Sequence, residues 1–141
     1  MKNLIEQMRP WGLNDRAFTE SDFYRICEAE DIAVVWSNQK FSFCLAALGA
    51  TCITLPKRLR GLRLLFAMFH ELGHHFAHVG SEPVALWLNM IHDKDEAEAD
   101  AIALVALMPK HLLGEMAYLD GSRYGCRLYN ERLRLYFLYD I

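Results

Sequence analysis

Three residues near the middle of the chain could bind and use a metal ion together. His70, Glu71 and His74 form the pattern H-E-x-x-H. Residues four apart lie on one face of a helix, so His70 and His74 can offer imidazole nitrogens to one ion. Glu71 lies about 100° around the helix from His70, where it can accept a proton from a water molecule at the ion. The alternative is a chance pattern in a helix with several histidines, and the sequence context below favours the metal site.

The histidines that follow this motif do not complete the ligand set. His78 lies eight residues after His70, or about 12 Å along a helix, which is too far for one ion. The metzincin pattern would place a histidine at position 80, where this chain has Gly80. We therefore expect His78 to lie near the end of the helix or to contact a ligand, and the third ligand to come from another segment.

An acidic segment that becomes apolar offers candidates for that third ligand. Within residues 93–109, Glu96 and Asp100 are four apart and share a helix face, whereas Glu98 points about 200° away from Glu96. Carboxylates on a buried helix are unusual unless they have partners. This face can offer Glu96 as a ligand and Asp100 as the group that holds a metal-binding imidazole. The alternative, an acidic first turn stabilised by the helix dipole, explains Asp100 poorly.

These motifs resemble those of the ImmA/IrrE family of metallopeptidases. The resemblance rests on HELGH at residues 70–74, EAEADAIA at residues 96–103 and LMP at residues 107–109, and it is strongest from Ile53 to Pro109. The chain departs from the family pattern at Ile102, where an aromatic residue is common, and at Ala106, where leucine is common. Both positions are expected in the core and do not touch the ligands.

The resemblance implies a zinc endopeptidase with a gluzincin-like site. His70, His74 and Glu96 would bind Zn²⁺, Glu71 would be the general base, and Asp100 would hold a ligand in place. The substrate would be a regulatory protein, such as a helix-turn-helix repressor of a phage, of a mobile element or of a stress response. Longer family members carry a DNA-binding or sensor-like domain, which we do not expect in a chain of 141 residues.

Two other functions stay compatible with these residues. The chain could be a zinc-binding regulator or adaptor that binds a partner without cleaving it, or the metal could be purely structural. An enzyme of this kind also needs a hydrogen-bond donor for the oxyanion, for which His92, His111, Tyr118 and Tyr124 are candidates. Its substrate could pair as a strand with the edge of a sheet near Cys52 to Leu55.

The elements that must position these residues can be predicted from periodicity, caps and breakers. The patterns predict helices over residues 2–8, 19–29, 58–77, 93–109, 110–116 and 126–139, and strands over residues 32–36, 41–45 and 52–55. Residues 126–139 also alternate in part like a strand, but helix formers favour a helix. Gly73 lies inside the motif helix, where close approach of another element would explain a glycine. The predicted fold is α+β: a mostly helical, zincin-like single domain over residues 1–141, with a small three-stranded antiparallel sheet beside the HExxH helix.

Composition limits where the protein works and what it binds. The net charge of −3 does not suggest general binding to nucleic acid. No signal peptide is apparent, and the longest apolar runs have eight residues, against the ~20 that a bilayer requires. Four cysteines without a CxxC pair suggest reduced core residues in the cytoplasm, with a disulfide framework as the alternative. The basic run at positions 57, 58, 60 and 63 is expected to be a solvated helix face, and contact with an acidic partner is the alternative.

Overall fold

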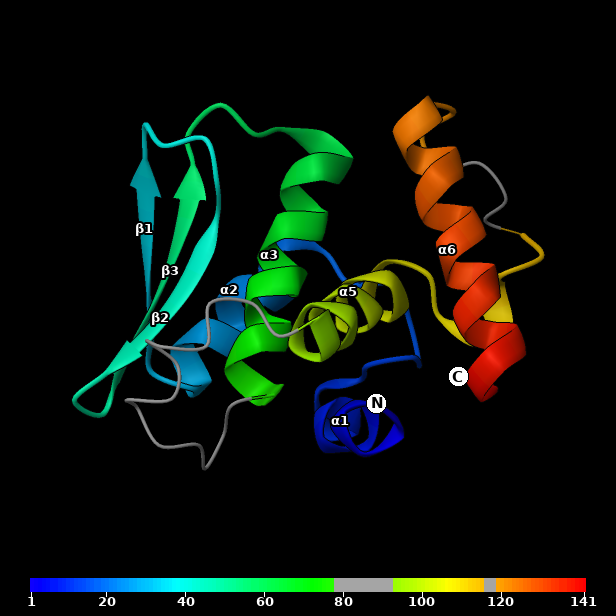
Figure 1. Cartoon of the computed structure of the whole chain (residues 1–141), viewed down its shortest axis with the longest axis horizontal. Coiled ribbons are helices and arrows are strands. Elements are labelled where there is room, and N and C mark those ends of the chain that lie inside the picture. Colours follow the sequence, from blue (N-terminus) through cyan, green and yellow to red (C-terminus); the bar gives the residue numbers. More distant parts are fainter. Residues whose placement is uncertain (78–92, 116–118) are drawn as a thin grey trace.

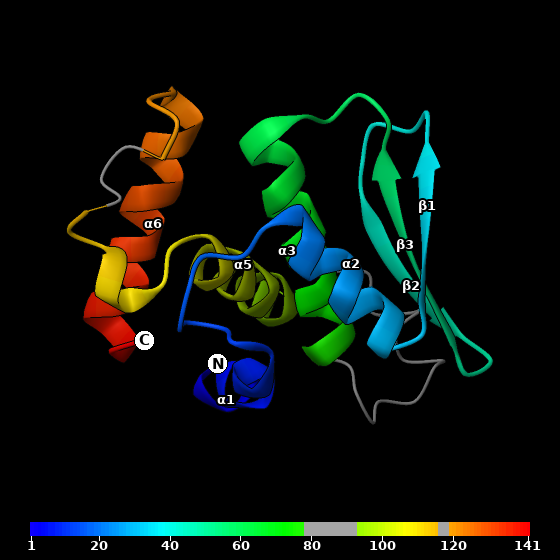
Figure 2. The same ribbon diagram turned by 180° about the vertical axis from the view of Figure 1, so that it is seen from behind.

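Helices and one small sheet form the fold, so the predicted α+β class is confirmed. The computed structural model describes residues 1–77, 93–115 and 119–141. Its elements are α1 (Lys2–Met8), η1 (Arg9–Trp11), α2 (Glu20–Ala29), β1 (Ile32–Ser37), β2 (Phe43–Ala47), β3 (Ala50–Pro56), α3 (Gly61–Ala77), α5 (Asp93–Leu107), η2 (Lys110–Leu112) and α6 (Arg123–Tyr139). The sheet, α3, α5 and α6 follow one another across the molecule (Figure 1), and α2 covers α3 from behind (Figure 2).

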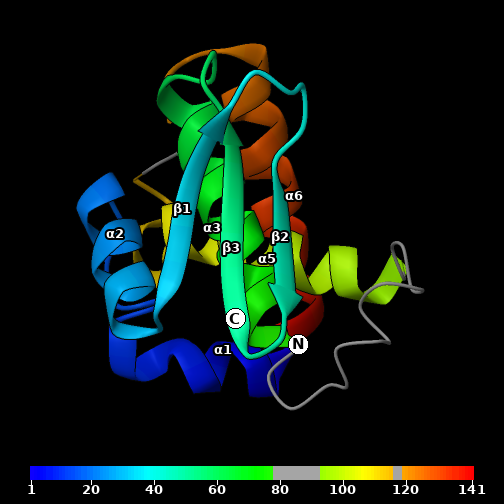
Figure 3. The same ribbon diagram turned by 90° about the vertical axis from the view of Figure 1, so that its left-hand side faces the viewer.

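The sheet is mixed rather than antiparallel. β2 and β3 form an antiparallel hairpin, joined by a two-residue turn in which Leu48 and Gly49 both have positive φ, 52° and 78°. Turns of this kind match the twist of a hairpin. β1 pairs with the other side of β3 in parallel, so the strand order is β1-β3-β2. The all-antiparallel prediction is wrong because residues 38–42 carry the chain past the position of β3 before β2 begins (Figure 3).

Helix boundaries agree with the sequence where local signals are strong. α1 spans the predicted residues, and α2 is capped by Thr19, whose backbone N–H donates to the Asp22 carboxylate at 2.8 Å. α3 begins at Gly61 instead of the predicted Arg58. Gly61 has a φ of 58°, which is incompatible with a right-handed helix, so the helix cannot extend back through this residue. The basic residues before it form a turn instead.

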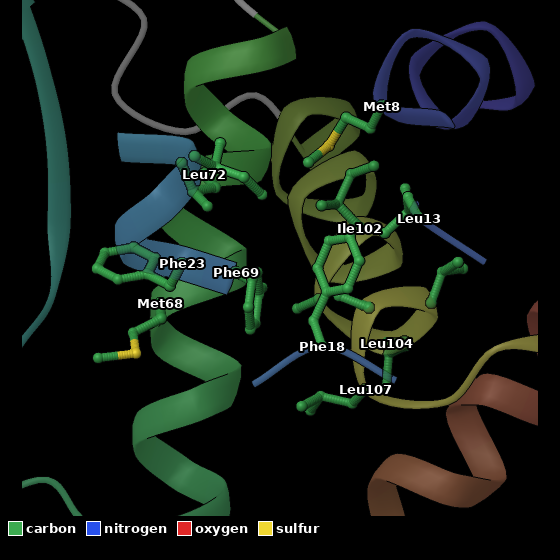
Figure 4. Packing of buried hydrophobic residues seen from close by; sticks show 14 of the residues in the cluster. Met8, Leu13, Phe18, Phe23, Met68, Phe69, Leu72, Ile102, Leu104 and Leu107 are labelled. Atoms are coloured by element: carbon green, nitrogen blue, oxygen red, sulfur yellow. The ribbon is translucent and has the colours of Figure 1, made fainter. Parts of the chain in front are cut away.

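The main hydrophobic core lies between α2, α3 and α5. Phe69 of α3 is fully buried, and its ring centroid lies 5.4 Å from that of Phe18 and 6.2 Å from that of Phe23. Figure 4 shows the Phe18 ring beside Ile102 of α5, with Phe69 between α3 and α5. The core thus holds one side of α3 in place and leaves its other sides to the sheet and to the polar residues of the motif.

α3 and α5 approach each other closely at Gly73. A Cβ atom on Gly73 would lie 2.7 Å from the Cα atom of Ala99, a distance that real Cβ contacts do not reach. The predicted reason for a glycine inside the motif is therefore confirmed. The contact lies one residue before His74 and three residues after Glu96, so it fixes the helix spacing at the predicted metal ligands.

The C-terminal helix is anchored to the end of α5. Arg132 of α6 is fully buried and donates from Nε to the carbonyl oxygen of Met108 at 2.7 Å. Burial lowers the pKa of Arg132 to about 10. The helical prediction for this segment is confirmed, and the helix starts at Arg123, capped by Ser122, whose Oγ accepts from the Gly125 N–H at 2.9 Å.

Several other predictions have simple outcomes. All four cysteines are free. Within residues 1–77, 93–115 and 119–141, no helix has the length and apolar character needed to cross a membrane. The predicted helix 110–116 is only the short η2, and Met116 lies outside the described residues. The segment around Gly80, together with His78, His92 and Tyr118, also lies outside them.

Candidate metal centre

The structure brings the three predicted metal ligands together. His70 and His74 are four residues apart on α3, and their Nε2 atoms are 3.1 Å apart. Glu96 of α5 meets both, with one carboxylate oxygen 3.0 Å from His74 Nε2 and the other 3.4 Å from His70 Nε2. In the described part of the chain this is the one group of three or more side chains with metal-ligand geometry.

The three side chains lie close enough for one atom of each to bind the same ion, because these atoms lie within 4.8 Å of one another. Zinc binds imidazole nitrogen and carboxylate oxygen at about 2.0–2.2 Å, which places neighbouring ligand atoms of a tetrahedron about 3.3 Å apart. The three measured separations, 3.0, 3.1 and 3.4 Å, lie around that value. Two imidazoles and one carboxylate also match the donor set of a catalytic zinc site, and zinc therefore fits these residues.

Asp100 and Glu98 take the roles that their helical spacing predicts. The Nδ1–H of His70 donates to Oδ1 of Asp100 at 2.8 Å, which leaves Nε2 of His70 free for a metal. Glu98 lies on another face of α5, where its carboxylate accepts from the terminal ammonium of Met1 at 3.1 Å. Glu96 rather than Glu98 is therefore the carboxylate placed to bind the ion.

Glu71 lies on the sheet side of α3. It is 3% exposed, and its Oε1 accepts a hydrogen bond from Oγ of Ser42, just before β2, at 2.6 Å. Burial raises the pKa of Glu71, and the Ser42 hydrogen bond and the nearby His70 offset this only in part. A carboxylate with a raised pKa is a better base near neutral pH. The sequence analysis did not identify Ser42.

Negative charge gathers around the two imidazoles. Burial lowers the pKa of His70, but its hydrogen bond to Asp100 and the charges of Glu71 and Glu96 outweigh this, and the net pKa is raised. Among the described residues, no Lys or Arg forms an ion pair with Glu71, Glu96 or Asp100. The chain itself therefore supplies little positive charge here, as is typical of a site that binds a cation.

Aromatic rings extend the site toward the start of α6. Phe66 stacks against His70 with ring centroids 5.9 Å apart, and Tyr124 packs edge-on against Phe66 at 6.4 Å. Burial raises the pKa of Tyr124, and the charges of Arg63 and Arg127 offset this only in part. Tyr124 is therefore the one candidate oxyanion donor that the structure describes near the metal ligands. His111 lies elsewhere, in a surface pocket beside α1.

His75, the remaining histidine of α3, does not join the metal ligands. Its Nε2 lies 3.3 Å from the carboxylate of Glu30 at the end of α2, so it links these two helices. Its contact is therefore structural.

Comparison with known proteins does not add to the residue-based evidence. No family model matches the chain, and a search of curated proteins finds no relative. The resemblance to the ImmA/IrrE family consequently rests on the motifs alone.

Proposed function

We propose that this chain is a zinc-dependent endopeptidase. The observation that carries the proposal is the convergence of His70, His74 and Glu96 within metal-ligand distance, with Glu71 next to His70 on the same helix. Structural zinc sites usually use four protein ligands, whereas catalytic sites use three and keep a position for water or substrate. Three ligands converge among the described residues, and a buried base adjoins them, which favours catalysis over a structural site.

The reaction would be hydrolysis of a peptide bond. A zinc ion held by these ligands would lower the pKa of a water molecule to about 7 and polarise the scissile carbonyl. Glu71 accepts a proton from the attacking water and later delivers it to the leaving amine. The water oxygen bonds to the carbonyl carbon, the carbon–nitrogen bond breaks, and the two products are a carboxylate and an amine. Tyr124 is the described candidate for donating to the oxyanion.

The substrate would add a strand to the edge of β2 that faces away from β3 and pairs with no strand of residues 1–77, 93–115 and 119–141. The sequence predicts this contact near Cys52 to Leu55, but these residues belong to β3, which is paired on both sides. β2 is an edge strand of the sheet (Figure 3), and Ser42 immediately before it touches the predicted base. A peptide paired with β2 would therefore pass close to the metal ligands.

The biological target follows from the family resemblance. We propose a regulatory protein, such as a helix-turn-helix repressor of a phage or mobile element, as the substrate. The free cysteines fit a reducing compartment, so we also propose a cytoplasmic location. A repressor encoded beside this chain would be the first candidate to test.

Replacing Glu71 with glutamine tests the enzymatic proposal. The Glu71→Gln variant keeps the size of the side chain and should keep the zinc, but it cannot accept the proton, so the rate should fall about 10²–10⁴-fold. The chain would be co-expressed with the neighbouring repressor, and the repressor's length followed on a gel. Wild type and a matched control, Glu131→Gln on the exposed surface of α6, should shorten the repressor, and Glu71→Gln should leave it whole.

A different result would support the adaptor function instead. If wild type and Glu71→Gln relieve repression equally while the repressor stays intact, the chain acts by binding and the enzymatic proposal fails. Zinc content measured on both purified proteins would show that the comparison concerns the base and not the metal.

A further inference from the structure

Basic side chains from three parts of the chain gather at the end of the molecule where α3 and α6 begin. We call this set the basic rim: Lys40, Lys57, Arg58, Arg60, Arg63 and Arg127. Arg58 donates to the carbonyl oxygen of Lys40 at 3.1 Å, and Arg63 and Arg127 lie over the same ring, Tyr124, at 4.2 and 5.4 Å. Figures 1 and 3 show both helix starts at this end of the molecule.

The charges of the basic rim have no carboxylate partner among the described residues. All six side chains are exposed, and none forms an ion pair with an Asp or Glu of the described residues. Two of them are instead directed to backbone oxygens: Arg58, as above, and Arg60, whose Nη1 donates to the carbonyl oxygen of Lys57 at 2.5 Å. The whole chain has a net charge of −3, so the rim is a local reversal of the overall sign.

The rim is continuous with the metal centre. Arg63 and His70 are seven residues apart on α3, which places them on nearly the same face and about 10 Å apart along the helix axis. Phe66 lies between them, where it stacks on His70 and packs against Tyr124. Arg63 covers the Tyr124 ring. An apolar aromatic surface thus joins the metal ligands to the cations.

A solvated helix face explains this arrangement less well than a binding surface. The basic run of residues 57–63 could be solvated on its own, but Lys40 precedes β2 and Arg127 comes from α6. Their convergence on one end of the site is a property of the fold. A peptide lying along β2 would reach this end, because β2 starts beside Ser42 and Lys40.

We propose that the basic rim binds acidic side chains of the substrate, about three residues from the bond that is cleaved. An extended peptide advances about 3.3 Å per residue, so three residues cover the ~10 Å from His70 to Arg63. The intervening residue would contact Phe66 and Tyr124. The predicted position of the acidic residues along the substrate rests on the proposed peptidase function. The predicted preference for acidic residues rests on the basic rim alone.

The test uses peptides that are anchored at the metal. Ten-residue peptides carrying a terminal hydroxamate, a metal-binding group, would contain a block of three Glu or three Gln placed one, three or six residues from the anchor. Their affinity for the zinc-loaded, full-length chain would be measured by fluorescence anisotropy. We expect the Glu block at a spacing of three to bind about tenfold more tightly than the Gln block, and the difference to shrink in high salt.

A double variant identifies the groups responsible. Arg63→Gln with Arg127→Gln should reduce the preference for Glu to less than about twofold, because it removes the two cations nearest the aromatic surface. The matched control, Arg9→Gln with Arg134→Gln, removes two exposed arginines elsewhere and should leave the preference unchanged. Circular dichroism would confirm that both double variants keep the fold.

Three outcomes would overturn the proposal. Equal affinity for Glu and Gln peptides at every spacing would show that the rim is only solvated. Loss of the preference in the control variant would place it elsewhere. Stronger displacement of the peptide by a thymidine oligonucleotide of equal charge would assign the rim to nucleic acid. If the hydroxamate adds nothing, the zinc site fails, and the same Glu and Gln peptides without the anchor still decide the charge preference.

Discussion

Two clusters of polar side chains in this molecule both contain carboxylates, but their charges are balanced differently. In the first, Asp22 near the start of α2 receives hydrogen bonds from Arg16 and Arg25 and from the backbone of Thr19. In the second, three carboxylates surround the imidazoles of α3, and no Lys or Arg of the described residues pairs with them. The first cluster is electrically complete, whereas the second carries negative charge that a bound cation would balance.

The difference separates a stabilising cluster from one that is suited to bind a cation. Buried carboxylates are destabilising unless they are paired, so a folded protein neutralises them where stability is the only requirement. The arginines near Asp22 do this and hold its pKa well below the usual range. The carboxylates of Glu71, Glu96 and Asp100 have no such partner among the described residues, and this arrangement favours binding of a cation.

The largest expected effect is the loss of metal from the second cluster. His70→Ala or His74→Ala should abolish tight zinc binding, with a loss of about 10³-fold or more, because each removes one of three ligands. Glu96→Ala should weaken binding strongly. Metal analysis and competition with a chelator would measure this. Zinc that stays bound in both histidine variants would remove the basis of the comparison.

Asp22→Asn should have the opposite signature, with lower stability and unchanged zinc binding. Hydrogen bonds to a charged partner contribute about 1.5–3 kcal/mol, so the free energy of unfolding should fall by about 2–3 kcal/mol at pH 7. Because the folded-state pKa of Asp22 is depressed, its contribution is fully present above its unfolded pKa of about 3.9. It is lost progressively as the pH falls from there through the lower folded-state pKa. Urea unfolding from pH 7 to pH 3 should show a smaller loss of stability in the variant than in wild type.

Asp100→Asn should weaken zinc binding without removing it. Partners that hold a metal-binding imidazole typically contribute 10- to 100-fold in affinity, or about 1.4–2.7 kcal/mol. The change should leave the free energy of unfolding of the metal-free protein nearly unaffected. An affinity equal to wild type would show that the contact between Asp100 and His70 does not orient the ring.

Glu98→Gln should have the smallest effect on the metal. Glu98 lies two residues from Glu96 but pairs with the ammonium of Met1, so zinc affinity should stay within about twofold while stability falls by up to about 1 kcal/mol. Calorimetric titration with zinc and thermal unfolding would measure the two quantities. A larger loss of zinc in Glu98→Ala than in Glu96→Ala would refute the assignment of the third ligand.

The residues of the metal centre were predictable because their relations are local. The spacings from His70 to His74 and from Glu96 to Asp100 are fixed within single helices, and the helix period decides which side chains share a face. Ser42 was not predictable in this way. It lies 29 residues before Glu71, in a connection without periodicity, and its contact depends on where the fold places β2.

The sheet shows the same limit at the level of strands. The turn at Leu48 and Gly49 is a local signal and correctly indicates a hairpin. No local pattern indicates which strand pairs with the other edge of β3. In a simple meander β1 would pair with β2, whereas here it pairs with β3. Packing against α2 and α3 fixes that choice, and a reading of strand and turn patterns does not contain it. The start of α6, which brings Tyr124 to the site, is also a tertiary outcome.

Every missense change of the Gly73 codon adds a Cβ atom, so this position is expected to tolerate no substitution. Ala99 of the neighbouring helix leaves no room for that carbon, so the helices would have to move apart. Metal coordination tolerates errors of only about 0.2 Å in bond length, far less than such a shift. A change that removes no ligand and touches no substrate would therefore damage the chemistry. Selection for metal binding would therefore preserve glycine at position 73, where α3 crosses α5.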